Sequence, residues 1–351
     1  MQFAIVGAGI AGLACADALQ SAGHSVSLFD KGRGPAGRMS TRRLQTSLGE
    51  VGIDHGAQYF TVRDPAFRQL AATWSDLGIA VPWPSAGADA WVGVPGMNAI
   101  VRQMASAHAV TWNQYVTGMA RRNGQWWLMG QAGDIGPFDA VVLAIPAEQA
   151  AGILSLHDFS MARIALMARS QPCWTSMFVF AHPLAGLPPV VRNAGEIAWA
   201  ARNSAKPGRP GTEAWVVQAS AAWSSARLED APEQISAMLL AALADAAGCA
   251  VPEPIAAVSH RWRYALSAGT GDGALWNNET RLGVCGDWLL GPRVECAWLS
   301  GRLLAETRIL PRQGAETAKV DSSAKGIPAK KSRAASPTTC PKGHMEPGFM
   351  S

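Results

Sequence analysis

A glycine-rich turn between a short apolar strand and a helix opens the chain. The strand FAIVG runs into GAGIAG at residues 7–12, and a second strand, HSVSLFD, ends at Asp30. In such a turn Gly7 permits the sharp bend, Gly9 lets the backbone approach a pyrophosphate, and Gly12 lets helix and strand pack closely. The helix N-terminus attracts phosphate charge, and Asp30 is placed to bind ribose hydroxyls. This pattern predicts a dinucleotide-binding β-α-β unit.

The segment after Asp30 favours FAD over NAD. DKGRGPAGRMST (30–41) is a second glycine-rich loop, where an NAD domain would continue into its next helix. Arg33 and Arg38 are suited to neutralise a pyrophosphate, and Lys31 to lie over the adenosine end. The alternative is a flexible, solvated basic loop. We favour the cofactor interpretation because Gly32, Gly34 and Gly37 allow close backbone approach.

Three further β-α pieces lie far apart in the 351-residue chain. PFDAVVLAIPAEQA (137–150) reads as a buried strand and a helix start, LGVCGDW (282–288) as another strand, and VECAWLSGRLLAETRIL as a closing helix. Irregular and alternating segments between them, such as TSMFVFAHPL, indicate a second, sheet-containing domain inserted into the first. The predicted fold class is α/β, a Rossmann-like FAD domain interleaved with a mixed-sheet α+β domain, which the family resemblance described below implies is a substrate domain. The predicted boundaries are 1–62, 93–155 and 270–310 for the FAD domain, 63–92 and 156–269 for the substrate domain, and 311–351 for a disordered basic tail.

Charge and composition exclude several classes of function. Seven Lys or Arg against three Asp or Glu after residue 310 account for the whole net charge of +4, so no nucleic-acid surface is expected on the folded part. No apolar run approaches the roughly 18 residues of a membrane span, and the N-terminus lacks a secretory signal. The six cysteines show no CxxC pair or metal-ligand spacing. We therefore expect a soluble, cytoplasmic protein without a metal site.

The order of five motifs resembles the flavin-containing amine oxidases and, among them, the bacterial renalase group. These motifs are GAGIAG, DKGRGPAGRMST, DHGAQYFT, VVLAIPA, and CGDW followed by VECAWLSG. The resemblance spans about residues 1–310, and WAARNSAKPGR (199–209) and HRWRYA (260–265) are closer to renalases. It implies a glutathione-reductase-type FAD domain and noncovalent FAD. It also implies oxidation of mis-reduced nicotinamide dinucleotides, the 1,2- or 1,6-dihydro isomers of NAD(P)H, to NAD(P)+, with O2 becoming hydrogen peroxide.

The resemblance also implies positions around the cofactor. Asp287 would accept hydrogen bonds from the ribityl hydroxyls, the backbone of Val116 would meet the adenine, and Ala57 would lie beside the isoalloxazine. Asp30 stands where amine oxidases usually carry a glutamate, and Ala36 replaces a glycine. The predicted cofactor-binding residues are Gly7, Gly9, Ile10, Ala11, Gly12, Asp30, Lys31, Gly37, Arg38, Met39, Ala57, Gln58, Val116, Gly286, Asp287 and Val294.

Substrate positions follow from the same resemblance, each with a structural alternative. Tyr59, Phe60 and Met97 are equally explained as core residues, and His260 as a hydrogen-bonded interdomain histidine. Arg202, Lys206 and Arg209, in a loop that looks mobile, would grip a substrate pyrophosphate or form a solvated face. The predicted substrate residues are Gln58, Tyr59, Phe60, Thr61, Pro95, Gly96, Met97, Asn203, Lys206, His260, Trp288 and Arg293.

Three functions remain open from the sequence. Hydride transfer from a dihydronicotinamide needs no protein base, so the first hypothesis assigns no catalytic residue beyond the flavin N5. The second is a flavin amine oxidase or desaturase-like enzyme acting on an amine or polyene. Many amine oxidases use a lysine at the flavin, and before residue 311 the only lysines are Lys31 and Lys206. The third is a flavoprotein that binds FAD without turnover.

Overall fold

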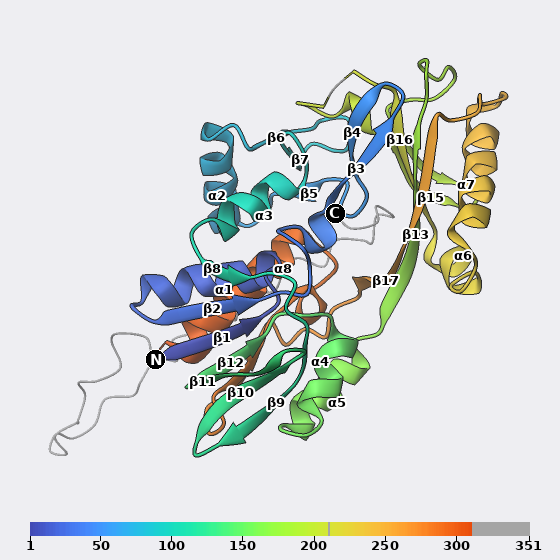
Figure 1. Ribbon diagram of the computed structural model, residues 1–351. Helices are drawn as coiled ribbons and strands as arrows, with labels where there is room; N and C mark the ends of the chain where they lie inside the picture. Colours follow the sequence, from blue (N-terminus) through green and yellow to red (C-terminus); the bar gives the residue numbers. More distant parts are fainter. Residues whose placement is uncertain (210, 311–351) are drawn as a thin grey trace, which may run out of the picture.

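A six-stranded sheet forms the centre of the computed structural model, which describes residues 1–209 and 211–310 (Figure 1). Its strand order is β18-β19-β12-β1-β2-β8, parallel except for β18. Ile5 on the central strand pairs with Leu28 on one side and Val142 on the other. The strands are β1 (Gln2–Val6), β2 (Ser25–Phe29), β8 (Ala109–Thr111), β12 (Ala140–Leu143), β18 (Leu275–Asn277) and β19 (Leu282–Val284).

Helices α1 (Ile10–Ser21) and α8 (Val294–Leu303) lie side by side on this sheet (Figure 1). Gly301 permits their close contact, because a Cβ there would overlap the backbone of Ala11. The chain thus returns at its far end to complete the first sheet, as the sequence predicts. The strand expected to end at Gly286 ends at Val284, and Asp287 begins a 3-10 turn, η3 (Asp287–Leu289). The π-helix η4 (Leu304–Ile309) follows α8.

A five-stranded antiparallel sheet, in the order β14-β15-β16-β13-β17, forms the second sheet region. Figure 1 shows α7 along one side of it, while Leu44 and Ile53 of a β3–β4 hairpin pack with Met177, Val179 and Val216. The pairing of β17 with β13 shifts between Gln171 and Cys173. The elements are β3 (Thr41–Thr46), β4 (Gly49–Asp54), β13 (Ser170–Val179), β14 (Val190–Ala194), β15 (Ile197–Arg202), η2 (Asn203–Ala205), β16 (Ala214–Ala219), α6 (Ala221–Ala226), α7 (Pro232–Ala247) and β17 (Ala256–Ser267).

The remaining elements surround the first sheet. Phe67 of α2 packs on Trp298 of α8 with ring centroids 5.2 Å apart, so part of segment 63–92 contacts the predicted FAD domain. The domain boundaries themselves stay a prediction. These elements are η1 (Gly37–Met39), β5 (Phe60–Thr61), α2 (Pro65–Asp76), β6 (Ala80–Pro82), β7 (Ala90–Gly93), α3 (Asn98–Ala105), β9 (Val116–Arg122), β10 (Gln125–Gly130), β11 (Gly133–Phe138), α4 (Ala147–Leu154) and α5 (Phe159–Met167).

Two sequence expectations concern the chain as a whole. Within residues 1–209 and 211–310, every helix is too short or too polar to span a bilayer. Cys15, Cys173, Cys249, Cys285 and Cys296 are free thiols. The predicted disordered tail, 311–351, lies outside the described residues.

Candidate functional site

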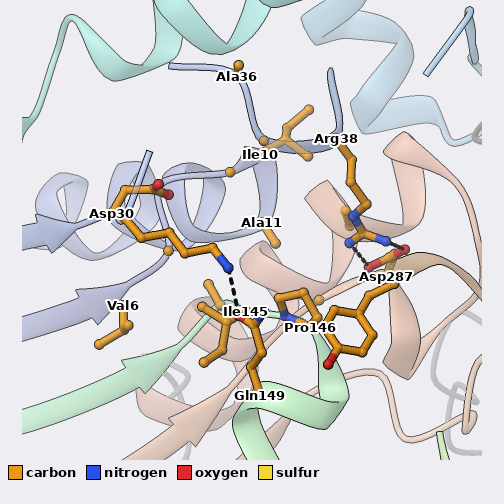
Figure 2. A pocket seen from close by; sticks show the side chains of 18 of the residues that line it. Val6, Ile10, Ala11, Asp30, Ala36, Arg38, Ile145, Pro146, Gln149 and Asp287 are labelled. Carbon is orange, nitrogen blue, oxygen red and sulfur yellow. Dashed lines mark hydrogen bonds and ion pairs between the residues drawn. The ribbon is translucent and has the colours of Figure 1, made fainter. Parts of the chain in front are cut away.

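A cavity of about 450 Å³ lies at the carboxyl ends of the parallel strands. The ends of β1 and β2, the β12–α4 connection and the β19–α8 connection all contribute to it (Figure 2). This edge of an open parallel sheet is where nucleotide ligands bind, because the loops there diverge around a crevice. The remaining walls come from η1, the start of β9 and residues 262–265 of β17.

The first glycine loop forms one wall, and its glycines have different roles. Gly7 has a positive φ of 104°, and a Cβ there would overlap the Ala144 carbonyl. A Cβ on Gly12 would overlap the carbonyl oxygen of Gly7, so this glycine lets α1 cross the strand end. Gly9 lines the cavity, and a Cβ on it would meet no protein atom within 4 Å. The wall therefore has open space beside a helix N-terminus, as an anionic pyrophosphate requires.

Asp30 lies at the next position along this wall. Its Oδ2 accepts a hydrogen bond from the Ala8 amide at 2.8 Å and its Oδ1 one from the Gly32 amide at 2.7 Å. Each carboxylate oxygen keeps a second lone pair for a ribose hydroxyl. Beyond it, Lys31 also lines the cavity and donates from Nζ to Gln149 Oε1 at 3.4 Å.

Arg38 and Asp287 form a bidentate ion pair in the cavity wall (Figure 2). Arg38 Nη1 donates to Asp287 Oδ2 at 2.7 Å and Nη2 to Oδ1 at 2.5 Å, and Nη1 also reaches the Ala265 carbonyl at 3.3 Å. The sequence assigned the two residues separate tasks, one at the pyrophosphate and one at the ribityl chain. The structure instead joins them into one polar group at the cavity.

Most of the predicted cofactor residues line this cavity. The two exceptions are Gly12, which acts by packing, and Gln58, which is fully buried and donates to the Asp54 and Gly56 carbonyls. Arg33 also lies outside the lining, although its loop contributes. Lining residues that the sequence did not assign to the cofactor include Gln114, Tyr115, Thr117, Ile145, Pro146, Gln149, Gly152, Ile153, Trp262, Arg263, Tyr264, Ala265, Pro292 and Ala297.

Only Arg293 among the predicted substrate residues outside the cofactor set lines the cavity. Phe60 packs on Phe67 and Trp74, and Tyr59 on Trp199, as the core interpretation of these residues expects. Trp288 is buried and donates from Nε1 to the Ile145 carbonyl at 3.1 Å.

Residues 95–97 and 61 also lie away from the cavity. Met97 is fully buried and donates its amide to Asp54 Oδ1 at 2.9 Å. Gly96 is buried against Thr41, Pro95 is exposed, and Thr61 is buried in the short strand β5. No contact with a substrate in the cavity follows from these positions, and their assignment stays a prediction.

The prediction that Lys206 and Arg209 lie in a mobile loop and bind a substrate pyrophosphate is wrong, because both side chains are buried and bonded to other protein groups. Lys206 Nζ donates to Asp54 Oδ2 at 3.2 Å and to Gln58 Oε1 at 3.0 Å, and Arg209 Nη2 donates to the same Asp54 oxygen at 2.6 Å. The Lys206, Arg209 and Asp54 side chains are all 0 or 1% exposed. Asn203 is buried beside them, with Nδ2 donating to the Gly52 carbonyl at 3.0 Å.

The same burial changes the ionisation of this cluster. Burial would raise the pKa of Asp54, but Lys206 and Arg209 hold it well below its ordinary value. Burial lowers the pKa of Lys206 to about 8, although Asp54 opposes the shift. Arg202 is engaged elsewhere, with Nε 3.2 Å from Glu213 Oε1.

His260 lies in an aromatic cluster beside the cavity rather than in its wall. Its ring is 4.4 Å from Trp262 and 5.1 Å from His55 between centroids. Trp262 lines the cavity and donates from Nε1 to the His55 carbonyl at 2.8 Å. Burial and neighbouring positive charge lower the pKa of His55 to about 3 and that of His260 to about 4, so both imidazoles are neutral at pH 7.

Comparison with known proteins agrees with this geometry. Residues 5–74 match the NAD(P)-binding Rossmann-like domain, and residues 84–307 match the flavin containing amine oxidoreductase family. Cyclohexylamine oxidase from Brevibacterium oxydans IH-35A is similar in structure, with 14% identity, a TM-score of 0.65, and 87% of this chain and 98% of that chain covered.

Two other solved structures share the fold. A putrescine oxidase bound to putrescine shows 14% identity and a TM-score of 0.62, with 87% of this chain and 98% of that chain covered. An oxidoreductase from Methanosarcina mazei shows 16% identity and a TM-score of 0.56, with 87% and 100% covered. At these identities the likeness concerns the fold.

The cavity residues fit the FAD that flavin containing amine oxidoreductases bind, typically without a covalent link. The open space at Gly9 would hold the pyrophosphate, the carboxylate of Asp30 a ribose, and the Arg38–Asp287 pair the polar middle of the cofactor. Among the described residues, no carboxylate in the cavity wall lacks a hydrogen-bond partner.

Proposed function

We propose, from the premise that this chain belongs to the flavin containing amine oxidoreductase family, that its substrates are the 1,2- or 1,6-dihydro isomers of NAD(P)H. The protein is a flavin-dependent oxidoreductase with FAD as its cofactor. When bound, FAD would supply the hydride acceptor, and the electrons would pass to O2, which takes up one further proton from solvent to give hydrogen peroxide while NAD(P)+ is released. The glutathione-reductase-type description of the FAD domain, and a renalase-like identity, belong to this proposal.

The charge of the cavity wall carries the proposal. The wall includes Trp262, Arg263, Tyr264 and Arg293, which are aromatic or cationic. Arg263 is paired with Glu229, and Arg293 Nη1 lies 3.6 Å from Glu295 Oε2. The carboxylates of the cavity, Asp30 and Asp287, are already engaged by backbone amides or by Arg38. Such a wall offers aromatic faces to a planar nicotinamide ring but leaves an aminium cation no unengaged carboxylate to pair with.

The proposed reaction requires no acid or base from the side chains. A dihydronicotinamide becomes aromatic on losing a hydride, so the chain needs only to orient the donor ring and exclude water. No histidine is among the described residues that line the cavity, and Lys31 is hydrogen-bonded to Gln149. We therefore assign binding and orientation, rather than proton transfer, to Trp262, Tyr264 and Arg293.

An amine or polyene oxidase is the second candidate, and Lys206 supports it. This buried lysine has a pKa lowered to about 8 and donates to Gln58, the neighbour of Ala57 in the cavity wall. It is therefore the one described lysine that could act near a flavin ring in the manner of amine oxidases. Against this role, its ammonium is also paired with Asp54.

Anaerobic reduction of the purified holoprotein tests both candidates. Separated 1,2- and 1,6-dihydro isomers of NADH and NADPH are mixed with the protein, and the flavin absorbance is followed. Rapid bleaching by at least one isomer, and none by putrescine or cyclohexylamine, is expected. Bleaching by amines alone would replace the first candidate by the second. Protein purified without FAD would contradict the cofactor assignment as well.

A further inference from the structure

We infer that Arg42, His55 and His260 form an anion-binding subsite beside the cavity, which takes a phosphate group of the substrate. The identity of that substrate as a dinucleotide rests on the proposed function, whereas the presence of the subsite does not. None of the predicted contacts includes Arg42 or His55. The subsite would select anionic over cationic substrates at the same cavity.

Strand alternation brings the three residues together. Successive side chains of a strand point to opposite faces, so Arg42 shares the face of Leu44, and His55 continues the face of Ile53. Leu44 and Ile53 pack in one cluster with Val258 of β17. His260, two residues further along β17, therefore meets Arg42 and His55 where this apolar contact ends.

The subsite adjoins the cavity through Trp262. Trp262 lies two residues beyond His260 on the same face of β17, and its ring is 5.2 Å from that of His55. The rings of His55 and His260 are 89° apart in orientation, edge to face. Arg42 and His260 are half-buried, so a group that enters from the cavity or from solvent can reach them.

The charge of Arg42 is the first feature of the subsite. Within residues 1–209 and 211–310, no carboxylate pairs with its guanidinium. Asp54 acts to raise the pKa of His55, but its carboxylate is already paired with Lys206 and Arg209.

Charge on the other face of β17 is likewise compensated. Arg261 and Arg263 point away from the subsite and pair with Glu229. The positive field of Arg42 thus acts on two neutral imidazoles without local compensation, and it helps to lower both histidine pKa values.

This arrangement matches the chemistry of a phosphate. A guanidinium donates two parallel hydrogen bonds to phosphate oxygens, and each neutral imidazole adds one N–H donor. Ser40 Oγ lies 3.3 and 3.4 Å from the two ring nitrogens of His55 and can hold one of them while the other turns to the ligand. A bound dianion would also offset the charge of Arg42 that now disfavours the imidazolium forms.

Titration calorimetry of the FAD-loaded protein with inorganic pyrophosphate tests the subsite without turnover. Arg42→Gln and His260→Gln are expected to weaken binding by about 10- to 100-fold, the loss of a charge-assisted hydrogen bond. Arg43→Gln is the matched control, because Arg43 is exposed on the opposite face of the same strand and lies 3.7 Å from Glu50. It should bind within about twofold of the wild type.

The outcomes separate this inference from the proposed function. Equal binding by the Arg42 and Arg43 variants, or no saturable binding to the wild type, would overturn the subsite even if dihydro-NAD(P) isomers bleach the flavin. Arg42-dependent binding in a protein that no dihydronicotinamide reduces would support the subsite and refute the dinucleotide substrate. If the subsite and the dihydronicotinamide substrate are both correct, Arg42→Gln should raise KM for the dihydro isomer while leaving the flavin content unchanged.

Discussion

Arg38 and Asp287 are joined by two hydrogen bonds, of 2.5 and 2.7 Å, although 249 residues separate them in the sequence. Arg38 comes from the loop after the first β-α-β unit, and Asp287 from the 3-10 turn η3 that follows β19. Their pair therefore links, at the cavity, the segments that follow two strands of the six-stranded sheet, β2 and β19. Asp287 is 7% exposed and Arg38 32%, so the pair is shielded mainly on the Asp287 side.

Asp287→Ala should yield protein depleted of flavin. The change leaves the Arg38 guanidinium with only the Ala265 carbonyl and removes an acceptor for the polar middle of FAD. Breaking such a pair costs about 3 kcal/mol, the low end for buried pairs because Arg38 is partly solvated. The ratio of flavin to protein absorbance measures the effect. Asp89→Ala is the control, since its ion pair with Arg63 is exposed and should not influence flavin content. Full retention of flavin by Asp287→Ala would contradict the assignment.

Gly9→Ala should lower FAD affinity, whereas Gly12→Ala should lower the stability of the protein itself. A methyl group on Gly9 meets no protein atom within 4 Å, so the free energy of unfolding without FAD should change by less than about 1 kcal/mol. Because that methyl group enters the space left for the pyrophosphate, FAD affinity should fall at least about tenfold. A methyl group on Gly12 overlaps the Gly7 carbonyl, so Gly12→Ala should destabilise the flavin-free protein by about 2 kcal/mol or more. Urea unfolding and flavin titration of both variants separate the effects, and equal stability losses would contradict this distinction.

Local patterns explain why much of the cofactor site could be predicted. The turn at Gly7, the helix after it and the acid at Asp30 lie within one β-α-β unit, whose geometry is fixed by short-range backbone constraints. Continuous apolar runs marked β12 and β19 as buried parallel strands. Asp287 and Val294 were placed by the resemblance of their motifs, and the structure brings both to the same cavity.

The unpredicted part depends on contacts between distant segments. Lys206 reaches Asp54 across 152 positions, and nothing in the local sequence of a loop rich in Gly, Pro and Lys indicates burial. Residues 262–265 enter the cavity wall as a consecutive run beside the shifted pairing of β17 with β13. Such irregularities change the direction in which side chains point, but they cannot be recognised from the alternation of apolar and polar residues in the sequence. Only the aromatic character of Trp262 and Tyr264 pointed toward a planar ligand.

Asp30→Ala should weaken FAD binding without preventing folding. The carboxylate accepts hydrogen bonds from the amides of buried Ala8 and half-buried Gly32, so its removal leaves the Ala8 amide without this acceptor and costs about 1–3 kcal/mol, which the fold should tolerate. Loss of a charged acceptor for the ribose predicts about 10- to 100-fold lower affinity for FAD. Asp30→Glu is the matched variant because it restores the carboxylate one methylene further out. Fluorescence titration of flavin-free protein gives both values, and an affinity unchanged in Asp30→Ala would remove Asp30 from the binding residues.

Lys206→Met should change how the free energy of unfolding depends on pH. Burial lowers the pKa of Lys206 to about 8 in the folded protein, from an ordinary 10.5. Between these two pH values the unfolded chain binds a proton that the folded protein does not, so the stability of the wild type rises with pH there. Below pH 8 both states are protonated, and the cost of the buried charge is present in full. Between pH 8 and 10.5, the free energy of unfolding of the wild type should therefore rise by about 3 kcal/mol relative to that of Lys206→Met. Urea unfolding at several pH values, with the exposed Lys31→Met as control, measures this gain. A difference that stays constant over that range would show that Lys206 does not lose its proton inside the fold.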